Sequence, residues 1–245
     1  METDYLVVGA GSAGCALANR LSADPDVTVT LLEAGGWDWN PWIHIPVGYF
    51  KTMHNPSVDW CYRTEPDPGL NGRRLDWPRG KVMGGSSSLN GLLYVRGQPQ
   101  DYDRWAQMGF AGWSWQDVLP LFKRAENQER GADDFHGAGG PLNVSDMRLS
   151  RPICDAWVAA AQAAGYPFNP DYNGATQEGV GYFQLTTRKG RRCSAAVAYI
   201  HPVRKRPNLR IITHAATRRV VIRDGRAVAV EYAGRDGQTR RIDVR

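Results

Sequence analysis

The sequence predicts an α/β fold in which a parallel sheet is joined to an antiparallel β-meander. The first observation is a complete β-α-β unit at the N-terminus, where apolar runs at residues 4–8 and 27–32 flank a glycine turn and a helix. Such a crossover implies parallel strands. The second is a series of strand-like runs near the C-terminus, separated by tight Asp-Gly turns.

Each element follows from its local sequence. The run at 4–8 is continuously apolar, as in a strand buried on both faces, and the helix at 13–21 lacks β-branched residues. Ser114 stands where it can cap a later helix. The remaining predicted helices cover residues 101–105, 114–126, 153–164 and 194–203. The meander is predicted from runs at 209–213, 219–223 and 227–232, with a last alternating run at 240–245.

Residues 35–80 are dense in Pro, Gly, Asn and Trp and show weak periodicity. Such a long irregular segment is typical of a loop that wraps a ligand or forms an active-site wall. Trp37, Trp39 and Trp42 either stack on a cofactor or fill a core beneath this loop, and the second interpretation is favoured.

Composition and charge exclude several classes of protein. Hydrophobic residues at 42% and charged residues at 22% are ordinary for a globular protein, and no apolar run approaches the ~20 residues that span a bilayer. The four cysteines form no C-x-x-C pair and no histidine lies at ligand spacing from one, so we expect free thiols and no metal. The net charge of +5 gathers beside turns and strand ends, which argues against a nucleic-acid partner. The absence of a signal peptide predicts the cytoplasm and leaves peripheral membrane association open.

A glycine cluster follows the first strand and opens the helix. Gly9 allows the tight turn, Gly11 lets a pyrophosphate approach the backbone, and Gly14 allows close packing of helix on strand. A G-x-G-x-x-G pattern alone is weak, but here it stands in register with a strand, a helix and a second strand. The cluster therefore predicts a dinucleotide site.

Two neighbouring segments complete this predicted site. Ser12 and Ala13 lie at the helix N-terminus, where free N–H groups and the helix dipole favour phosphate. Glu33, followed by Ala34, closes the second strand nineteen residues after Gly14, where a carboxylate accepts hydrogen bonds from ribose hydroxyls. An acid at this position disfavours a 2′-phosphate, but the pattern does not separate NAD from FAD.

A second constellation lies at residues 84–91, which read GGSSSLNG. Bare backbone and hydroxyl groups at Gly85 and Ser86 permit the close approach of a polar ligand, and Asn90 with Gly91 adds a side-chain amide. The alternative is a glycine-rich structural turn before a helix.

Longer motifs resemble a known family. The stretches GAGSAGCALANRLS…LLEAGG, PRGKVMGGSSSLNGLLYVRG, GWSWQDVLPLFKRAE, HGAGGPLNVSD and RPNLRIITHA occur in order. They resemble the N-terminal half of the glucose–methanol–choline (GMC) oxidoreductases, and look closest to bacterial FAD-dependent alcohol and choline dehydrogenases. The resemblance covers essentially the whole chain, with one small departure at Met83, where a branched aliphatic residue is more usual.

The resemblance implies an FAD-binding domain of the glutathione-reductase type, with part of an α+β substrate domain inserted. It implies boundaries at 1–150 for the first FAD-binding segment, 151–203 for the partial substrate domain and 204–245 for the return to the FAD domain. The glycine cluster and Glu33 would then hold the ADP half of FAD, and Thr217 would contact adenine through its backbone. The isoalloxazine ring would lie along Val82, Asn90, Gly91, Leu92 and Leu93. Leu89 stands where members with covalent flavin have histidine, so we expect non-covalent FAD.

The resemblance also implies the reaction. Such enzymes oxidise a primary alcohol, aliphatic or choline-like, by hydride transfer to flavin N5, and pass electrons to a quinone, a carrier or oxygen. The hydroxyl proton needs a base, which the resemblance places at a histidine beyond Arg245, so we expect this chain to be an N-terminal fragment whose catalytic residues lie elsewhere. The alternatives are a non-catalytic flavin-binding remnant and an NAD-dependent enzyme; the second leaves GGSSSLNG unexplained.

Overall fold

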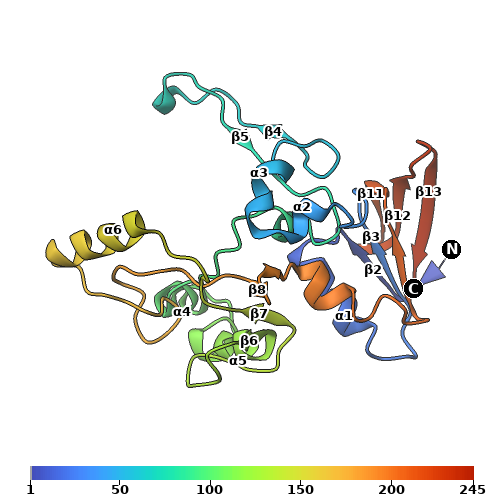
Figure 1. The fold of residues 1–245 in the computed structure, drawn as a ribbon. Helices are drawn as coiled ribbons and strands as arrows, with labels where there is room; N and C mark the ends of the chain where they lie inside the picture. The colour runs from blue at the N-terminus through green and yellow to red at the C-terminus, as the bar shows by residue number, and fades with distance from the viewer. Residues whose placement is uncertain (1) are drawn as a thin grey trace. The chain divides into compact units, whose positions relative to one another are not determined.

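The computed structural model describes residues 2–245, which form two compact units (Figure 1). Unit 1 contains residues 2–91 and 192–245, and unit 2 contains residues 92–191. Among the described residues, no helix combines the length and the apolar character needed to cross a bilayer.

The unit boundaries differ from the predicted segments 1–150, 151–203 and 204–245. Residues 92–150 pack with the residues that follow them: β6 (Glu126–Gln128) pairs in parallel with β7 (Leu142–Val144), and Ser145 bridges to Leu185. Local sequence patterns do not report such pairings, because the partners are far apart in the chain.

Unit 1 contains the predicted β-α-β element. Strand β2 (Tyr5–Val8) leads into helix α1 (Ser12–Leu21), and β3 (Val29–Leu32) pairs in parallel with β2. Strand β10 (Leu209–Ile212) pairs in parallel with the other edge of β3, giving the order β10-β3-β2. The parallel sheet is therefore confirmed.

The prediction that residues 209–213 belong to the meander is wrong. All four residues of β3 are buried, so this strand needs a partner on both sides, and β10 supplies the second from a position 180 residues later (Leu209 opposite Val29). The short apolar sequence of β10 suits either the parallel sheet or the meander, and only the pairing with β3 determines which sheet it joins.

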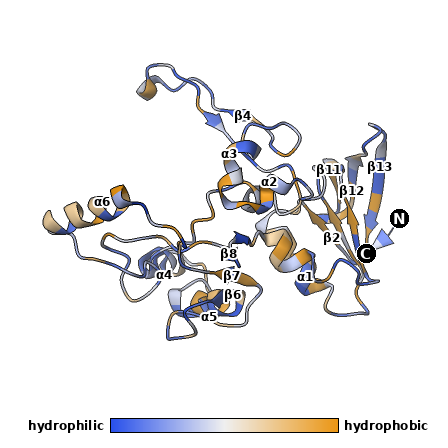
Figure 2. Ribbon diagram, in the orientation of Figure 1, coloured by the Kyte–Doolittle hydropathy of each residue, from blue (hydrophilic) through white to orange (hydrophobic). Residues whose placement is uncertain are grey.

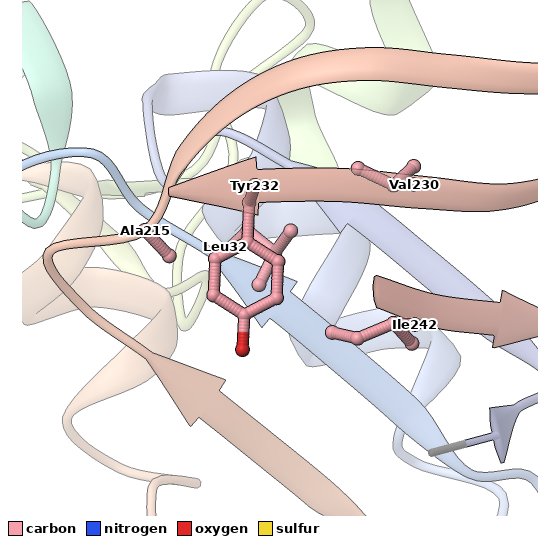
Figure 3. Close-up of a cluster of buried hydrophobic side chains, with 5 residues drawn as sticks. All are labelled: Leu32, Ala215, Val230, Tyr232 and Ile242. Carbon is pink, nitrogen blue, oxygen red and sulfur yellow. The ribbon is translucent and has the colours of Figure 1, made fainter. Parts of the chain in front are cut away.

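The meander forms a second sheet in unit 1. Strands β11 (Ala216–Arg223), β12 (Arg226–Ala233) and β13 (Thr239–Val244) are antiparallel, and β1 (Glu2–Thr3) adds in parallel to β13. Positive φ angles at Asp224 and Gly225 (48° and 75°) suit the hairpin turn between β11 and β12. The meander packs on the parallel sheet through one buried apolar cluster, made of Leu32, Ala215, Val230, Tyr232 and Ile242 (Figure 3).

The irregular segment of unit 1 contains only short elements. They are α2 (Pro41–His44), α3 (Tyr49–Thr52), β4 (Tyr62–Arg63) and β5 (Asp76–Trp77), with 3₁₀ turns at Pro46–Gly48, Pro68–Leu70 and Gly85–Ser88. The expectation that its tryptophans fill a core is wrong for two of them, because Trp39 is 62% exposed and Trp42 is 43% exposed. Trp39 instead stacks on Trp37, with ring centroids 5.4 Å apart.

The helices of unit 2 follow the predicted positions closely. They are α4 (Pro99–Gln107), α5 (Trp115–Ala125) and α6 (Pro152–Ala163), and short strands β8 (Thr187–Arg188) and β9 (Arg191–Arg192) come later. Ser114 caps α5 as predicted, since its hydroxyl accepts the Asp117 N–H. In unit 1, the helix predicted at 194–203 is shorter, a π-helical segment at Ala196–Ile200.

Candidate functional site

A cavity of about 450 Å³ lies at the carboxyl ends of β2 and β3 in unit 1. Ligands of open α/β sheets bind at this end of the strands. Seven of the predicted cofactor residues line it: Gly9, Gly11, Glu33, Ala34, Gly85, Ser86 and Thr217. We call this cavity the dinucleotide pocket.

The glycine turn forms the floor of the pocket. Gly9 has φ +89°, which L side chains rarely adopt. A Cβ on Gly14 would run into the backbone carbonyl of Gly9, so only glycine lets α1 approach β2 here. A Cβ on Gly11 would meet no atom within 4 Å, so the missing side chain there leaves space in the pocket.

The N-terminus of α1 opens beside this space. Gly11 is the N-cap in an extended conformation; no side chain caps the helix, and its first turn carries no acid. Ser12 and Ala13 are exposed. The first N–H groups of α1 therefore have no side-chain acceptor from within the helix, an arrangement suited to an anion.

The predicted ribose acceptor, Glu33, lies in the wall of the pocket and is only 6% exposed. One carboxylate oxygen accepts the Ala10 N–H and the other accepts the Gly35 N–H, each at 2.8 Å. Burial raises the pKa of this carboxyl. Each oxygen can accept a second hydrogen bond, so the two backbone bonds orient the carboxylate and leave it capacity for a ligand hydroxyl.

Thr217 contributes an additional polar group. Its Oγ1 is buried and has no hydrogen-bond partner among the described residues, although the residue lines the pocket. A buried hydroxyl without a partner is costly. The sequence predicted only a backbone contact at this position.

The opposite wall of the pocket was missed by sequence reasoning. Trp60, Tyr62, Arg79 and Gly80 line it, and the rings of Trp60 and Tyr62 stack with centroids 5.8 Å apart. No regular pattern of the sequence reports this pair, because Cys61 between the two rings has φ +53° and the segment is not a regular strand there.

The other predicted residues lie outside the pocket lining. Val82 is fully buried in a cluster with Ile43, Val58 and Leu89. Asn90 and Gly91 are exposed at the end of the first segment of unit 1.

The last two predicted flavin neighbours open unit 2. Leu92 has φ +66°, an unusual backbone conformation for a side chain of this size, and is buried. Leu93 is exposed and lines a separate apolar cavity of about 400 Å³ within unit 2. The structure therefore does not place these two residues in the dinucleotide pocket.

The groups that line the pocket fit a nucleotide with a diphosphate. They combine an uncapped helix N-terminus, a buried carboxylate, an unpartnered hydroxyl and a stacked aromatic pair. Within residues 2–245, no group of three or more His, Cys, Asp or Glu side chains is arranged to hold a metal, and no histidine lines this pocket. The site can bind and orient a dinucleotide but offers no evident base.

Comparisons with known proteins show what the chain is similar to. The family model described as GMC oxidoreductase matches residues 3–245. An alcohol dehydrogenase [acceptor] of Pseudomonas putida is 48% identical over 230 residues, which is 94% of this chain and 42% of that protein. An oxygen-dependent choline dehydrogenase of Sinorhizobium fredii is also 48% identical, over 94% of this chain and 42% of its own length. The chain thus spans less than half the length of these relatives.

Solved structures share the fold. Pyridoxine 4-oxidase from Mesorbium loti superposes with a TM-score of 0.94 at 37% identity, covering 99% of this chain and 48% of that one. A formate oxidase of Aspergillus oryzae, studied for the modification of its FAD, gives a TM-score of 0.88 at 25% identity and covers 99% and 44%. The predicted α/β fold of the FAD-binding type is therefore confirmed.

Proposed function

Because the chain belongs to the GMC oxidoreductase family, we propose that its dinucleotide pocket holds FAD and that the protein oxidises a primary alcohol to an aldehyde. The single observation that carries this proposal is the pocket itself, which unites the glycine turn, Glu33 and the start of GGSSSLNG in one cavity. The alcohol and choline dehydrogenases among its relatives support an aliphatic or choline-like substrate.

Different residues of unit 1 bind different parts of FAD. The N-terminus of α1, at Ser12 and Ala13, faces the diphosphate, and Gly11 permits its approach. Glu33 holds the ribose hydroxyls, and Thr217 lies at the adenine end. Asn90 and Gly91 lie along the flavin ring. When bound, FAD supplies a two-electron acceptor for the hydride of the carbinol carbon.

The proton of the alcohol needs a separate acceptor. No histidine of the described residues lines the dinucleotide pocket, so we propose that the base lies in sequence beyond Arg245. Electrons then pass to a quinone, a carrier or oxygen. We place the protein in the cytoplasm, with peripheral membrane association open to fractionation experiments.

The mode of flavin attachment follows from Leu89. Its side chain is buried with Ile43, Val58 and Val82 and has no atom that could bond to flavin. We therefore propose non-covalent FAD. Acid precipitation of the complete gene product should release all of the flavin into the supernatant, and flavin that stays on the polypeptide would contradict this.

The test of function is anaerobic reduction. The complete gene product is purified with FAD and mixed with ethanol, butanol, benzyl alcohol or choline, and flavin absorbance is followed. Bleaching by at least one alcohol is expected. Bound FAD that no alcohol reduces would favour the alternative of a non-catalytic flavin-binding protein, and bound NAD in place of FAD would refute both.

A further inference from the structure

Arg192 is a buried arginine that fastens one end of the GGSSSLNG loop. The residue is 2% exposed, and its guanidinium donates from all three nitrogens. Nε donates to the Ile43 carbonyl at 2.7 Å, Nη1 to the Ser87 carbonyl at 3.0 Å and the Asn90 Oδ1 at 2.8 Å, and Nη2 to the Asn90 carbonyl at 2.8 Å. Arg192 therefore holds both the backbone and the side chain of Asn90.

The charge of this arginine is unusual. No carboxylate of residues 2–245 forms an ion pair with it, and burial lowers its pKa to about 10. It stays protonated near neutral pH, solvated only by carbonyl and amide oxygens. Burying a cation in this way is costly, so the structure retains a destabilising feature at this loop.

Arg192 adds to local bonds at the distal end of the loop, where the Leu89 and Asn90 N–H groups donate to the Ser86 carbonyl at 3.0 and 2.9 Å. The loop begins with two glycines at positive φ, Gly84 at 89° and Gly85 at 53°, and continues as a short 3₁₀ turn to Ser88. The Ser87 hydroxyl accepts the Ala195 N–H at 2.9 Å, so the segment after Arg192 holds the loop at a second point. A planar guanidinium fixes direction as well as position, because its donors lie in one plane.

The contacts of Arg192 fall on one part of the loop only. Gly85 and Ser86 line the dinucleotide pocket, whereas none of residues 87–90 does. Arg192 touches Ser87 and Asn90, beyond the pocket. Loss of Arg192 should thus disturb the distal end of the loop and spare the nucleotide end.

We propose that Arg192 is a positioning residue for the flavin ring: it clamps Asn90 so that the ring-facing end of the loop is formed before FAD binds. This inference rests on the proposed function, because it assumes that the pocket holds the ADP half of FAD. Preorganisation of this kind raises affinity by removing the cost of ordering the loop on binding.

The experiment compares two ligands. Dissociation constants for FAD and for ADP are measured on the complete gene product stripped of cofactor, for wild type, Arg192→Met and Arg192→Lys. Arg192→Met should weaken FAD about ten- to hundredfold and change ADP affinity by less than about twofold. Arg192→Lys keeps the positive charge but not the planar guanidinium, and its FAD affinity should lie between those of wild type and Arg192→Met.

Arg206 provides the matched control. It is a half-buried arginine of unit 1 that donates to the Asn19 carbonyl and the Ser22 hydroxyl, away from the loop. Arg206→Met should leave the FAD and ADP affinities in their wild-type ratio. The visible spectrum of bound FAD gives a second readout, because a displaced ring environment shifts its bands in the Arg192 variants and not in Arg206→Met.

Each outcome of these titrations supports or contradicts the positioning role of Arg192. Equal losses for FAD and ADP would assign Arg192 a merely structural role, and no loss for either would overturn the inference. If Arg192→Met does not fold, Arg192→Lys decides by the same FAD-to-ADP ratio. Wild type that binds no FAD would instead refute the proposed function itself.

Discussion

The two units differ in the balance of apolar and polar side chains that they bury. In unit 1 most of the buried side chains are apolar, and Thr217, whose Oγ1 has no partner among the described residues, lines the dinucleotide pocket. In unit 2 many buried side chains are polar, and large apolar side chains such as Ile153 and Trp157 are exposed. Figure 2 shows α6 largely in the hydrophobic colours, although its residues are mostly exposed.

The buried polar groups of unit 2 satisfy one another. Glu126, fully buried, accepts from Arg96 at 2.7 Å, from His136 at 3.1 Å and from the Gly137 N–H at 3.1 Å. His136 reaches Asp171 at 2.9 Å through its other ring nitrogen. A fully connected network of this kind specifies one conformation for the loops that carry it.

The contrast indicates two uses of polarity. In unit 1, Glu33 and Thr217 line the dinucleotide pocket while Arg192 holds the neighbouring loop, whereas the polar network around Glu126 in unit 2 holds irregular chain in place. Changes in unit 2 should therefore affect stability, and changes around the pocket of unit 1 should affect ligand affinity. The predictions below test this division, from the largest expected effect to the smallest.

The largest effect is expected at the centre of the unit 2 network. Glu126→Ala leaves the Arg96 guanidinium buried without its partner, which should cost about 3–5 kcal/mol of stability. Urea unfolding, with hydrogen exchange at α5 and β6 to localise the loss, measures it. Glu129→Ala is the matched control: this carboxylate is exposed, accepts one bond from Asn143 and should cost less than about 1 kcal/mol. Similar losses in both variants would contradict the role given to the network.

The pH dependence of unit 2 follows from His136. Hydrogen bonds to Asp171 and then to Glu126 raise the pKa of this imidazole from 6.5 to about 9. Because the pKa of His136 is higher in the folded than in the unfolded protein, the protonated ring stabilises the folded state fully below about pH 6.5. This stabilisation is lost as the pH rises through 9. The loss should reach about 3 kcal/mol. Urea midpoints between pH 6 and 10 measure it, and His136→Gln should remove this slope; a slope of the same size in both proteins would assign it to other groups.

At the pocket of unit 1, Glu33→Gln should act on binding. The amide nitrogen is a donor, so the variant loses charge-assisted bonds to ribose worth about 1.5–3 kcal/mol of FAD affinity. The same nitrogen also faces a backbone N–H, of Ala10 or Gly35, that the carboxylate accepts in wild type. FAD titration of the stripped complete gene product measures the loss of affinity. Glu65→Gln, a surface carboxylate of unit 1 paired with Arg74, is the control and should bind as wild type. Unchanged FAD affinity in Glu33→Gln would remove Glu33 from the site.

The sequence predicts local elements well and long-range contacts poorly, in both units. The β-α-β element, the capped helix α5 and the helix α6 depend on local sequence, and all three were predicted to within a few residues. The pairing of β10 with β3 and the Glu126 network join residues far apart in sequence, so no local pattern reports them. In the same way, the glycine cluster predicted the floor of the pocket, and the sequence missed its aromatic wall at Trp60 and Tyr62.

Effects on stability and on ligand affinity should separate most clearly within the glycine turn, between Gly14 and Gly11. Gly14→Ala puts a Cβ against the backbone of Gly9, whose carbonyl carbon would stand 3.1 Å away and whose oxygen would be nearer still. Backbone cannot move aside as a flexible side chain can, so α1 must shift on β2 at about 1–3 kcal/mol. The better helix propensity of alanine, up to about 1 kcal/mol, offsets only part of this.

Gly11→Ala should do the opposite. Its φ of −74° suits any residue, and a Cβ there would meet no protein atom within 4 Å. Stability should change by less than about 1 kcal/mol, close to the preference of an N-cap for glycine over alanine. The methyl group instead enters the space where a diphosphate would approach the backbone, so FAD affinity should fall about tenfold or more. Urea midpoints and FAD titrations of both variants give a two-by-two comparison. A stable Gly14→Ala together with an unstable Gly11→Ala would show that the turn is not built as described, and wild-type FAD affinity in Gly11→Ala would mean that the diphosphate does not lie over this turn.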